Sequence, residues 1–256
     1  MTPFDRPIIL FLFSLLVLWL AARLGIWLHK RGPVLKESES NDFNVILGAT
    51  LTLLGLIIGF TFSMAISRYD QRKIYEEDEA NAIGTEYLRA GLLSADDAAN
   101  IRTLLRQYLD QRILFYKATR PSSLNEINAR TTQLQNDLWS AIRPAAAQPN
   151  AIVSLAVSGM NDVLNSQGYT QAAWWNRIPF SAWCLMFQIA IVGNIMLGFY
   201  LHDPVNMSRI KSVLSLVLPL VLSISFMLIA DIDSPRRGFI RVSPQNLISL
   251  SQSLGS

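Results

Sequence analysis

The sequence predicts an all-α membrane protein in which four transmembrane helices flank a helical extramembrane domain between the second and third spans. Hydrophobic residues make up 51% of the 256 residues and charged residues only 16%, a composition too apolar for an ordinary soluble domain. Four apolar stretches are long enough to cross a bilayer as helices. We expect spans 1 and 2 in 1–67, the helical domain in 68–177, spans 3 and 4 in 178–230, and a C-terminal tail in 231–256.

The first span covers 7–28 and is expected to remain as an anchor, because it is too long for a signal peptide and lacks a small-residue cleavage site. A linker over 29–42 follows, in which Gly32 and Pro33 favour a loop.

The second span is the uncharged stretch 43–67, which is 25 residues long. The chain continues without proline to Ala90, and Ala80, Ile83 and Tyr87 recur with it at the spacing of an amphipathic helix. The sequence therefore predicts one continuous helix that leaves the bilayer and enters water.

Three helices are expected in the extramembrane domain. Ser94 with Asp97 resembles a capping box at the first helix start, and Ser123 with Glu126 predicts a second start after Pro121. The third helix is expected over about 150–165, from its apolar spacing.

The third and fourth spans are expected over 178–201 and 212–230, joined by a tight turn at 202–204. Trp174, Trp175 and Arg177 resemble an interfacial anchor before the third span. Pro219 predicts a kink in the fourth.

Small residues recur along one side of the second span at steps of three and four, namely Gly48, Thr52, Gly55, Gly59 and Ser63. One interpretation is close helix packing, because Gly55 and Gly59 have the spacing that lets two membrane helices approach closely. The other is that the stripe lines a conduit, with hydroxyl groups from Thr52, Thr61 and Ser63.

The acidic run Glu76, Glu77, Asp78 and Glu79 is the most concentrated charge in the chain. It is interpreted either as a solvated helix surface paired with Arg72 and Lys73, or as an acidic ring at a pore mouth if the chain repeats around an axis.

Opposite charges are also dense just beyond the fourth span. These residues, Asp231, Asp233, Arg236 and Arg237, are expected to lock the helix end against Arg68 and Asp70 at the root of the long helix. Such pairs contribute to stability only if they are partly buried.

Catalytic chemistry is not predicted. His29 and His202 are far apart, Cys184 is the single cysteine and lies in an apolar run, and no glycine-rich phosphate loop is present. Residues 68–178 carry 12 Lys or Arg against 12 Asp or Glu, so no basic face for nucleic acid is indicated. We expect no enzyme activity, no cofactor and no metal site.

Four segments resemble the bestrophin-like family of bacterial four-span membrane proteins: GFTFS at 59–63, RYDQR at 68–72, EANAIGT at 79–85 and DIDSPRRG at 231–238. The resemblance covers most of the chain and implies the general plan of bestrophin ion channels. The aromatic neck and calcium-binding tail of bestrophins have no clear match here. The resemblance implies a homo-oligomeric ion channel, a pentamer as first expectation, with anions slightly favoured.

The functional classes that remain open are a channel whose second spans surround the axis, a non-conducting sensor or scaffold that docks a partner through the helical domain, and a transporter. The expected partners are the lipid bilayer, ions and further copies of the chain.

We expect both termini and the helical domain on the cytoplasmic side of a bacterial inner membrane, with eight flanking Lys or Arg on that side against six on the other. Lys30 and Arg31, which follow the first span directly, indicate the opposite orientation.

Overall fold

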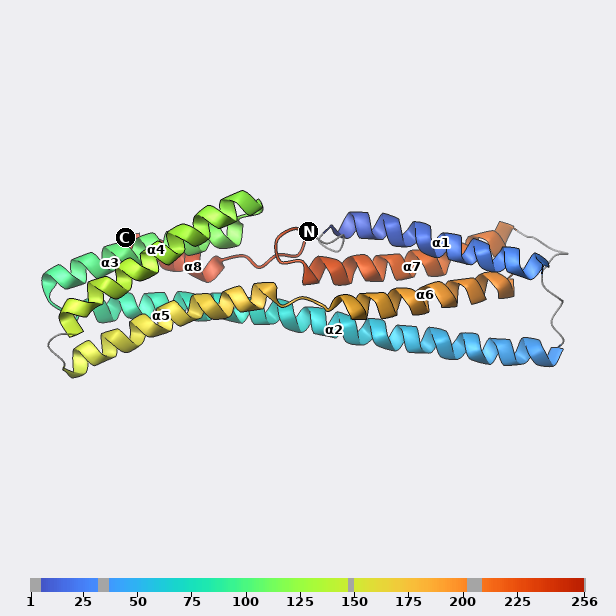
Figure 1. Cartoon of the computed structure of the whole chain (residues 1–256), viewed down its shortest axis with the longest axis horizontal. Helices are drawn as coiled ribbons and strands as arrows, with labels where there is room; N and C mark the ends of the chain where they lie inside the picture. The colour runs from blue at the N-terminus through green and yellow to red at the C-terminus, as the bar shows by residue number, and fades with distance from the viewer. Residues whose placement is uncertain (1–5, 32–36, 147–149, 202–208, 256) are drawn as a thin grey trace. The chain divides into compact units, whose positions relative to one another are not determined.

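The computed structural model describes residues 6–31, 37–146, 150–201 and 209–255, and these form eight α-helices without a strand (Figure 1). In chain order the helices are α1 (Pro7–Arg31), α2 (Glu37–Ala90), α3 (Ala95–Lys117), α4 (Pro121–Ala146), α5 (Ala151–Trp175), α6 (Phe180–Leu201), α7 (Arg209–Asp233) and α8 (Gln245–Gly255). Four stretches of helix are long and apolar enough to cross a membrane. The all-α fold with four membrane helices is confirmed.

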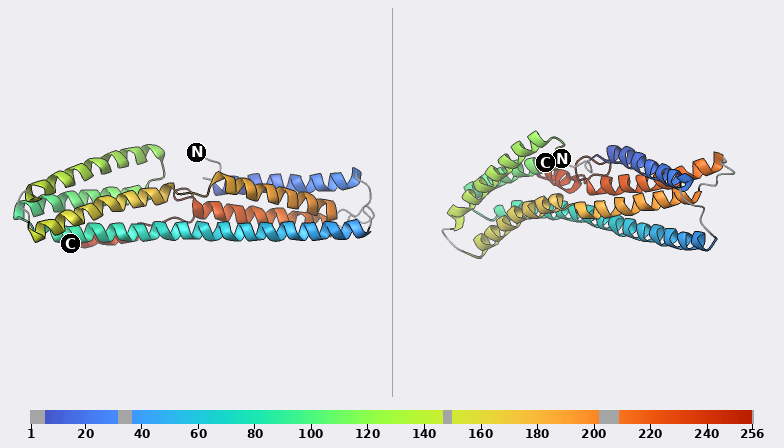
Figure 2. Two further views of the ribbon diagram at one scale, coloured as in Figure 1. Left: turned by 60° about the horizontal axis from the view of Figure 1, so that its bottom comes forward. Right: turned by 45° about the vertical axis from the view of Figure 1, so that its right-hand side comes forward.

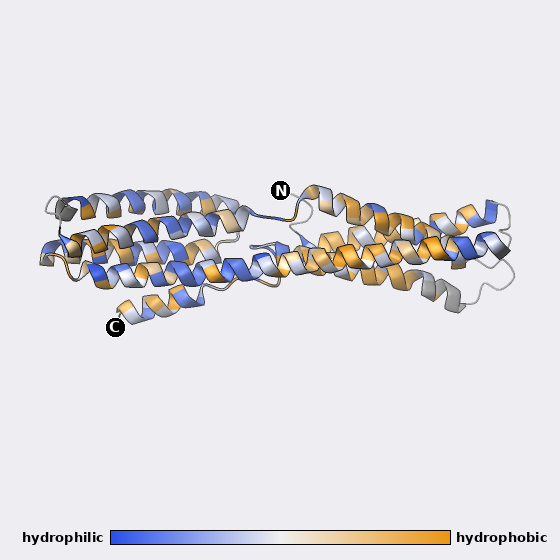
Figure 3. Ribbon diagram, turned by 90° about the horizontal axis from the view of Figure 1, so that it is seen from below, coloured by the Kyte–Doolittle hydropathy of each residue, from blue (hydrophilic) through white to orange (hydrophobic). Residues whose placement is uncertain are grey.

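The second span and the amphipathic segment after it form one helix, α2, of 54 residues, which is seen from another side in Figure 2. Its first residues, 37–42, are polar, the span that follows is hydrophobic, and the remainder of the helix is mostly polar, as the colours of Figure 3 show. The predicted continuous helix is confirmed. The expected linker over 29–42 is shorter than predicted, because His29 to Arg31 lie in α1 and Glu37 to Asp42 already belong to α2.

The chain divides into two compact units. The first contains residues 1–67 and 177–240, and the second contains residues 68–176 and 241–256. The tail 231–256, expected as one segment, is thus shared between the two. The turn expected at 202–204 lies outside the described residues.

The first unit is a bundle of apolar helices in which α1 packs against α6 and α7, and α6 packs against α7. Two glycines permit the closest approach of α1 and α6, because a side chain at Gly25 would overlap the Ile195 carbonyl and one at Gly198 would overlap the Ala22 carbonyl. Close packing through glycine therefore occurs at this crossing. The sequence reasoning had considered it only for α2.

The second unit buries an apolar core between the outer part of α2 and helices α3, α4, α5 and α8. Phe115, Tyr116 and Trp174 form an edge-to-face aromatic cluster, with the Trp174 ring centroid 5.1 Å from that of Phe115 and 5.4 Å from that of Tyr116. Trp174 was expected at the membrane interface, but it is a core residue because α5 continues ten residues beyond the predicted end at 165.

The two predicted helix starts had different outcomes. Ser94 caps α3, where its hydroxyl accepts from the Asp97 amide and donates to the Asp97 carboxylate. Ser123 does not cap α4, because the helix begins two residues earlier at Pro121 and the Ser123 hydroxyl donates to the Arg120 carbonyl instead. Proline suits the first helical position, where its missing N–H would have no intrahelical partner.

Candidate functional site

The stripe of small residues lies on a free face of α2. Gly48, Thr52, Gly55, Gly59 and Ser63 are all exposed, and a Cβ added to any of the three glycines would have none of the described atoms within 4 Å. The side that α2 turns to its own chain is different, with Leu47, Leu54, Thr61 and Ala65 buried. The stripe is therefore not used for packing inside the described chain.

Thr61 corrects one part of the sequence interpretation. It was counted among the hydroxyls of a possible conduit, but it is buried and donates to the Ile57 carbonyl at 2.7 Å. Thr61 therefore faces its own chain, whereas Thr52 and Ser63 stay on the exposed face.

A second exposed face of α2 carries large apolar side chains, namely Ile46, Leu53, Phe60 and Met64. At about 100° of rotation per residue, this ridge lies roughly a third of a turn from the small-residue stripe and a similar angle from the buried face. In the span, α2 thus presents three distinct surfaces.

The acidic run does not form one continuous surface. Glu77 and Asp78 are exposed, whereas Glu76 and Glu79 are buried in the second unit. Both sequence interpretations placed all four carboxylates in water, and they are wrong for Glu76 and Glu79 because α2 turns these two residues toward other helices.

Glu76 fastens the start of α8 to α2. Its carboxylate accepts from the Leu247 amide at 3.0 Å and from the Asn246 side-chain amide at 2.7 Å. A negative charge at a helix N-terminus satisfies an amide that has no intrahelical partner and interacts favourably with the helix dipole.

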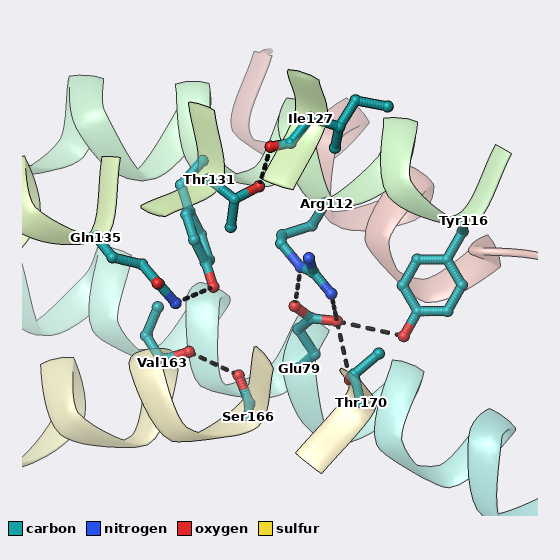
Figure 4. A network of polar contacts seen from close by, with 10 residues as sticks. Glu79, Arg112, Tyr116, Ile127, Thr131, Gln135, Val163, Ser166 and Thr170 are labelled. Atoms are coloured by element: carbon teal, nitrogen blue, oxygen red, sulfur yellow. Dashed lines mark hydrogen bonds and ion pairs between the residues drawn. The ribbon is translucent and has the colours of Figure 1, made fainter. Parts of the chain in front are cut away.

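Glu79 is the centre of a buried polar network (Figure 4). Its carboxylate pairs with the Arg112 guanidinium from α3, and accepts from the Tyr116 hydroxyl at 3.2 Å and the Thr170 hydroxyl of α5 at 3.3 Å. Both charged side chains are fully buried. Burial by itself lowers the pKa of Arg112, but the Glu79 charge beside it outweighs that effect and the pKa is raised.

The tyrosines around this pair stay neutral. Burial, together with the negative charge of Glu79, raises the pKa of Tyr116, and burial also raises the pKa of Tyr108. Each is therefore a neutral hydroxyl at physiological pH. The network holds α2, α3 and α5 together through one ion pair and its neutral hydrogen-bond donors.

Sequence reasoning missed these buried charges because it followed only the apolar residues. Arg72, Glu76, Glu79 and Glu86 lie at the same helical spacing as the buried residues Ile83 and Ala90. That shared spacing was the available signal: charged residues that continue an apolar stripe without a break are candidates for buried pairs.

Two buried aspartates organise the charge cluster, and both lie in the last turn of α7, which ends at Asp233 and not at residue 230 as expected. The Asp231 carboxylate accepts from the Phe239 amide at 2.6 Å and the Ile240 amide at 3.0 Å, which folds the chain back after α7. The Asp233 carboxylate accepts from Arg177 Nε at 2.9 Å and from the Ile178 amide at 3.3 Å, just before α6 begins. The aspartates therefore tie chain ends within the first unit, and locking against Arg68 and Asp70 stays a prediction.

The described residues include no group of three or more His, Cys, Asp or Glu that could hold a metal ion. The exposed stripe of α2 offers small side chains and hydroxyls, which can pack against another helix or line a path for ions.

Comparisons with known proteins give one sequence family and one fold. A family model described as the Bestrophin-like domain matches residues 15–247. No curated protein matches the sequence. A crystal structure of a bacterial Bestrophin homologue from Klebsiella pneumoniae, phased with zinc, is similar with a TM-score of 0.67 at 15% identity, covering 95% of this chain and 96% of that one.

A tyrosine-to-alanine mutant of a bacterial Bestrophin homologue from the same organism has a TM-score of 0.68 at 16% identity, covering 94% of this chain and 96% of that one. A structure described as a membrane protein with a proline-to-alanine mutation has a TM-score of 0.67 at 15% identity, covering 95% and 97%. The fold of the chain is thus similar to that of these proteins over nearly its whole length.

Proposed function

The chain belongs to the bestrophin-like family, and from this premise we propose that it is one subunit of a homo-oligomeric ion channel in which α2 lines the conduit. The observation that carries the proposal is the free face of α2. Gly48, Gly55 and Gly59 are exposed and have open space where a side chain would stand, although a buried position is usual for a small-residue stripe in a membrane helix. Another copy of the chain, or an aqueous path enclosed by several copies, would use that face.

An oligomer is part of the proposal because the described residues of one chain enclose no path along this stripe. A closed ring is the usual solution for identical subunits that contact one another head to tail. A pentamer is the first expectation, by analogy with bestrophins. A monomer at all concentrations in a mass measurement in nanodiscs would contradict the proposal.

The decisive experiment is reconstitution of the protein in liposomes, with ion flux measured under salt gradients of both signs. A channel gives passive flux that depends on the protein, and the sign of the reversal potential gives the preference between anions and cations. Liposomes that remain as tight as protein-free ones would remove the channel proposal.

Ser63→Glu tests whether the stripe faces the conduit. A carboxylate repeated around a pore wall is expected to raise cation over anion permeability. Met64→Glu is the matched control, because Met64 is the next residue, is also exposed, and lies about 100° away around the helix. A selectivity change in the Met64 variant but not in the Ser63 variant would assign the conduit to the ridge instead.

A sensor or docking role for the second unit is the second candidate. It is favoured by a groove of about 490 Å³ between α2 and the start of α8, whose lining includes the charged residues Asp70, Lys73, Glu77 and Arg241. Co-purification of a stoichiometric soluble partner with a protein that conducts no ions would support this candidate over the channel.

A further inference from the structure

Glu86 on α2 is a buried carboxyl group with no hydrogen-bond partner in the part of the chain that the structure describes. Its side chain is fully buried, and neither carboxyl oxygen has a donor. A charged carboxylate in such a place would lose its hydration without compensation. Glu79, two turns earlier on the same helix, shows the contrast because its carboxylate has an arginine and two hydroxyl donors.

The Glu86 side chain points at Gly159 of α5. A Cβ added to Gly159 would overlap the Glu86 Oε2 atom and the Arg89 guanidinium. Gly159 therefore leaves room for a carboxyl group in the contact between α2 and α5. Both carboxyl oxygens are buried in this contact, so hydration of a carboxylate there requires the contact to open.

The Arg89 guanidinium lies beside the Glu86 carboxyl group at Gly159 and favours its charged form, but among the described residues it makes no ion pair with Glu86. Arg89 pairs instead with Asp162 at 3.9 Å, and Asp162 is the single charged residue of α5. On the side of α3, Arg102 donates to the Tyr87 carbonyl and Arg106 donates to the Tyr87 hydroxyl.

We propose that Glu86 is a proton-binding site, and that the bound proton keeps the contact between α2 and α5 closed at Gly159. Loss of the proton leaves a carboxylate that must be hydrated, so the contact opens to admit water. The proposal concerns the second unit alone and does not depend on ion conduction.

The direction of the pH dependence follows from the two states of the contact. Burial raises the pKa of Glu86 to about 8 in the closed state, with Asp162 adding to the increase and Arg89 opposing it. In an open, hydrated contact the carboxyl has its ordinary value of 4.5. Opening is therefore least favourable below pH 4.5, becomes easier by up to about tenfold per pH unit between these two values, and levels off above pH 8.

The test is hydrogen–deuterium exchange of the full-length protein in nanodiscs from pH 5 to pH 9, corrected for intrinsic exchange and followed on α5 segments around Gly159. In the wild type, exchange is expected to accelerate with pH and to reach a plateau near pH 8. Glu86→Gln, which mimics the protonated form, should give slow exchange without pH dependence. Glu77→Gln, an exposed position on the same helix, should behave as the wild type does.

Two further variants retain Glu86 and shift the plateau in opposite directions. Asp162→Asn removes the charge that raises the pKa of Glu86, so the plateau should begin at lower pH. Arg89→Gln removes the charge that lowers it, so the plateau should begin at higher pH. If Glu86→Gln does not fold, the plateau shifts in these two variants test the proposal by themselves.

An infrared difference spectrum between pH 6 and pH 9 gives an independent readout. The wild type and Glu77→Gln should show loss of a protonated carboxyl band that is absent in Glu86→Gln. The proposal is overturned if exchange in Glu86→Gln rises with pH as in the wild type, or if neither Asp162→Asn nor Arg89→Gln moves the plateau.

Discussion

In the second unit, replacing a single buried charged residue is expected to change the stability of the fold strongly. Glu79 and Arg112 are fully buried, so each is stable in the core only while the other is present. Removing one partner leaves an uncompensated charge, whereas replacing both by apolar groups of similar size is often tolerated. By the same argument, the buried Glu76 and Glu79 matter more for stability than the exposed Glu77 and Asp78.

We predict that Arg112→Met destabilises the protein by about 3–5 kcal/mol, because it leaves Glu79 charged and unpaired in the core. The double variant with Glu79→Leu should be more stable than Arg112→Met alone. Thermal unfolding followed by circular dichroism in one detergent measures both effects as changes in Tm. Additive losses in the double variant would show that the two side chains are not coupled.

Asp231 is expected to be a second sensitive residue. Asp231→Ala removes the acceptor of the Phe239 and Ile240 amides, and should destabilise the turn after α7 by about 1–3 kcal/mol. Limited proteolysis at 234–240 should then become faster, while Asp78→Ala, an exposed control, leaves the rate unchanged. Equal rates in all three proteins would contradict this role.

At the scale of helices, local signals were reliable where one short motif was sufficient. The Ser94 cap and the absence of proline from 43 to 90 predicted the start of α3 and the continuity of α2. Prediction failed where the environment of a side chain depends on residues far away in the sequence. No local pattern shows that the Glu76 carboxylate accepts a hydrogen bond from the Leu247 amide. The sequence located the small-residue stripe of α2 but did not show whether it is exposed. Exposed and buried small residues have the same spacing in a sequence.

The glycines of the first unit allow a matched comparison. Gly198→Leu is expected to cost about 1–3 kcal/mol or more, because its side chain would meet the backbone of α1. Gly59→Leu should leave the fold of one chain intact, since the space around it is open in the described structure. Circular dichroism with thermal unfolding compares the two folds.

Gly59→Leu also separates the two interpretations of the stripe. If the stripe packs against a neighbouring copy, the variant should lose oligomer mass; if it lines the conduit, the oligomer should persist and the flux should fall. An intact oligomer with unchanged flux would remove this face of α2 from both the conduit and the subunit interface.

For the whole molecule, the sequence predicted four spans and a helical domain, but it did not predict that the tail belongs to two units. Residues 241–255 join the second unit, where α8 packs against α3. The helical region and α8 therefore lie on the same side of the membrane. Which side that is remains a prediction, since the flanking positive charges differ by only two residues between the sides.

Cysteine labelling tests the proposed cytoplasmic side. Ser122→Cys in a Cys184→Ser background places one thiol at an exposed position of the second unit. We expect no modification by a membrane-impermeant reagent in intact cells and ready modification after lysis. Modification in intact cells would reverse the assignment.

The discontinuous composition of the second unit has a consequence for biosynthesis. A ribosome completes residues 68–176 well before it makes α8, and α6 and α7 must be synthesised in between. Until α8 emerges, Glu76 lacks its partners Asn246 and Leu247, and one side of α3 is uncovered. Residues 241–255 thus complete a domain begun at residue 68, so this domain can finish folding only after α6 and α7 have been synthesised.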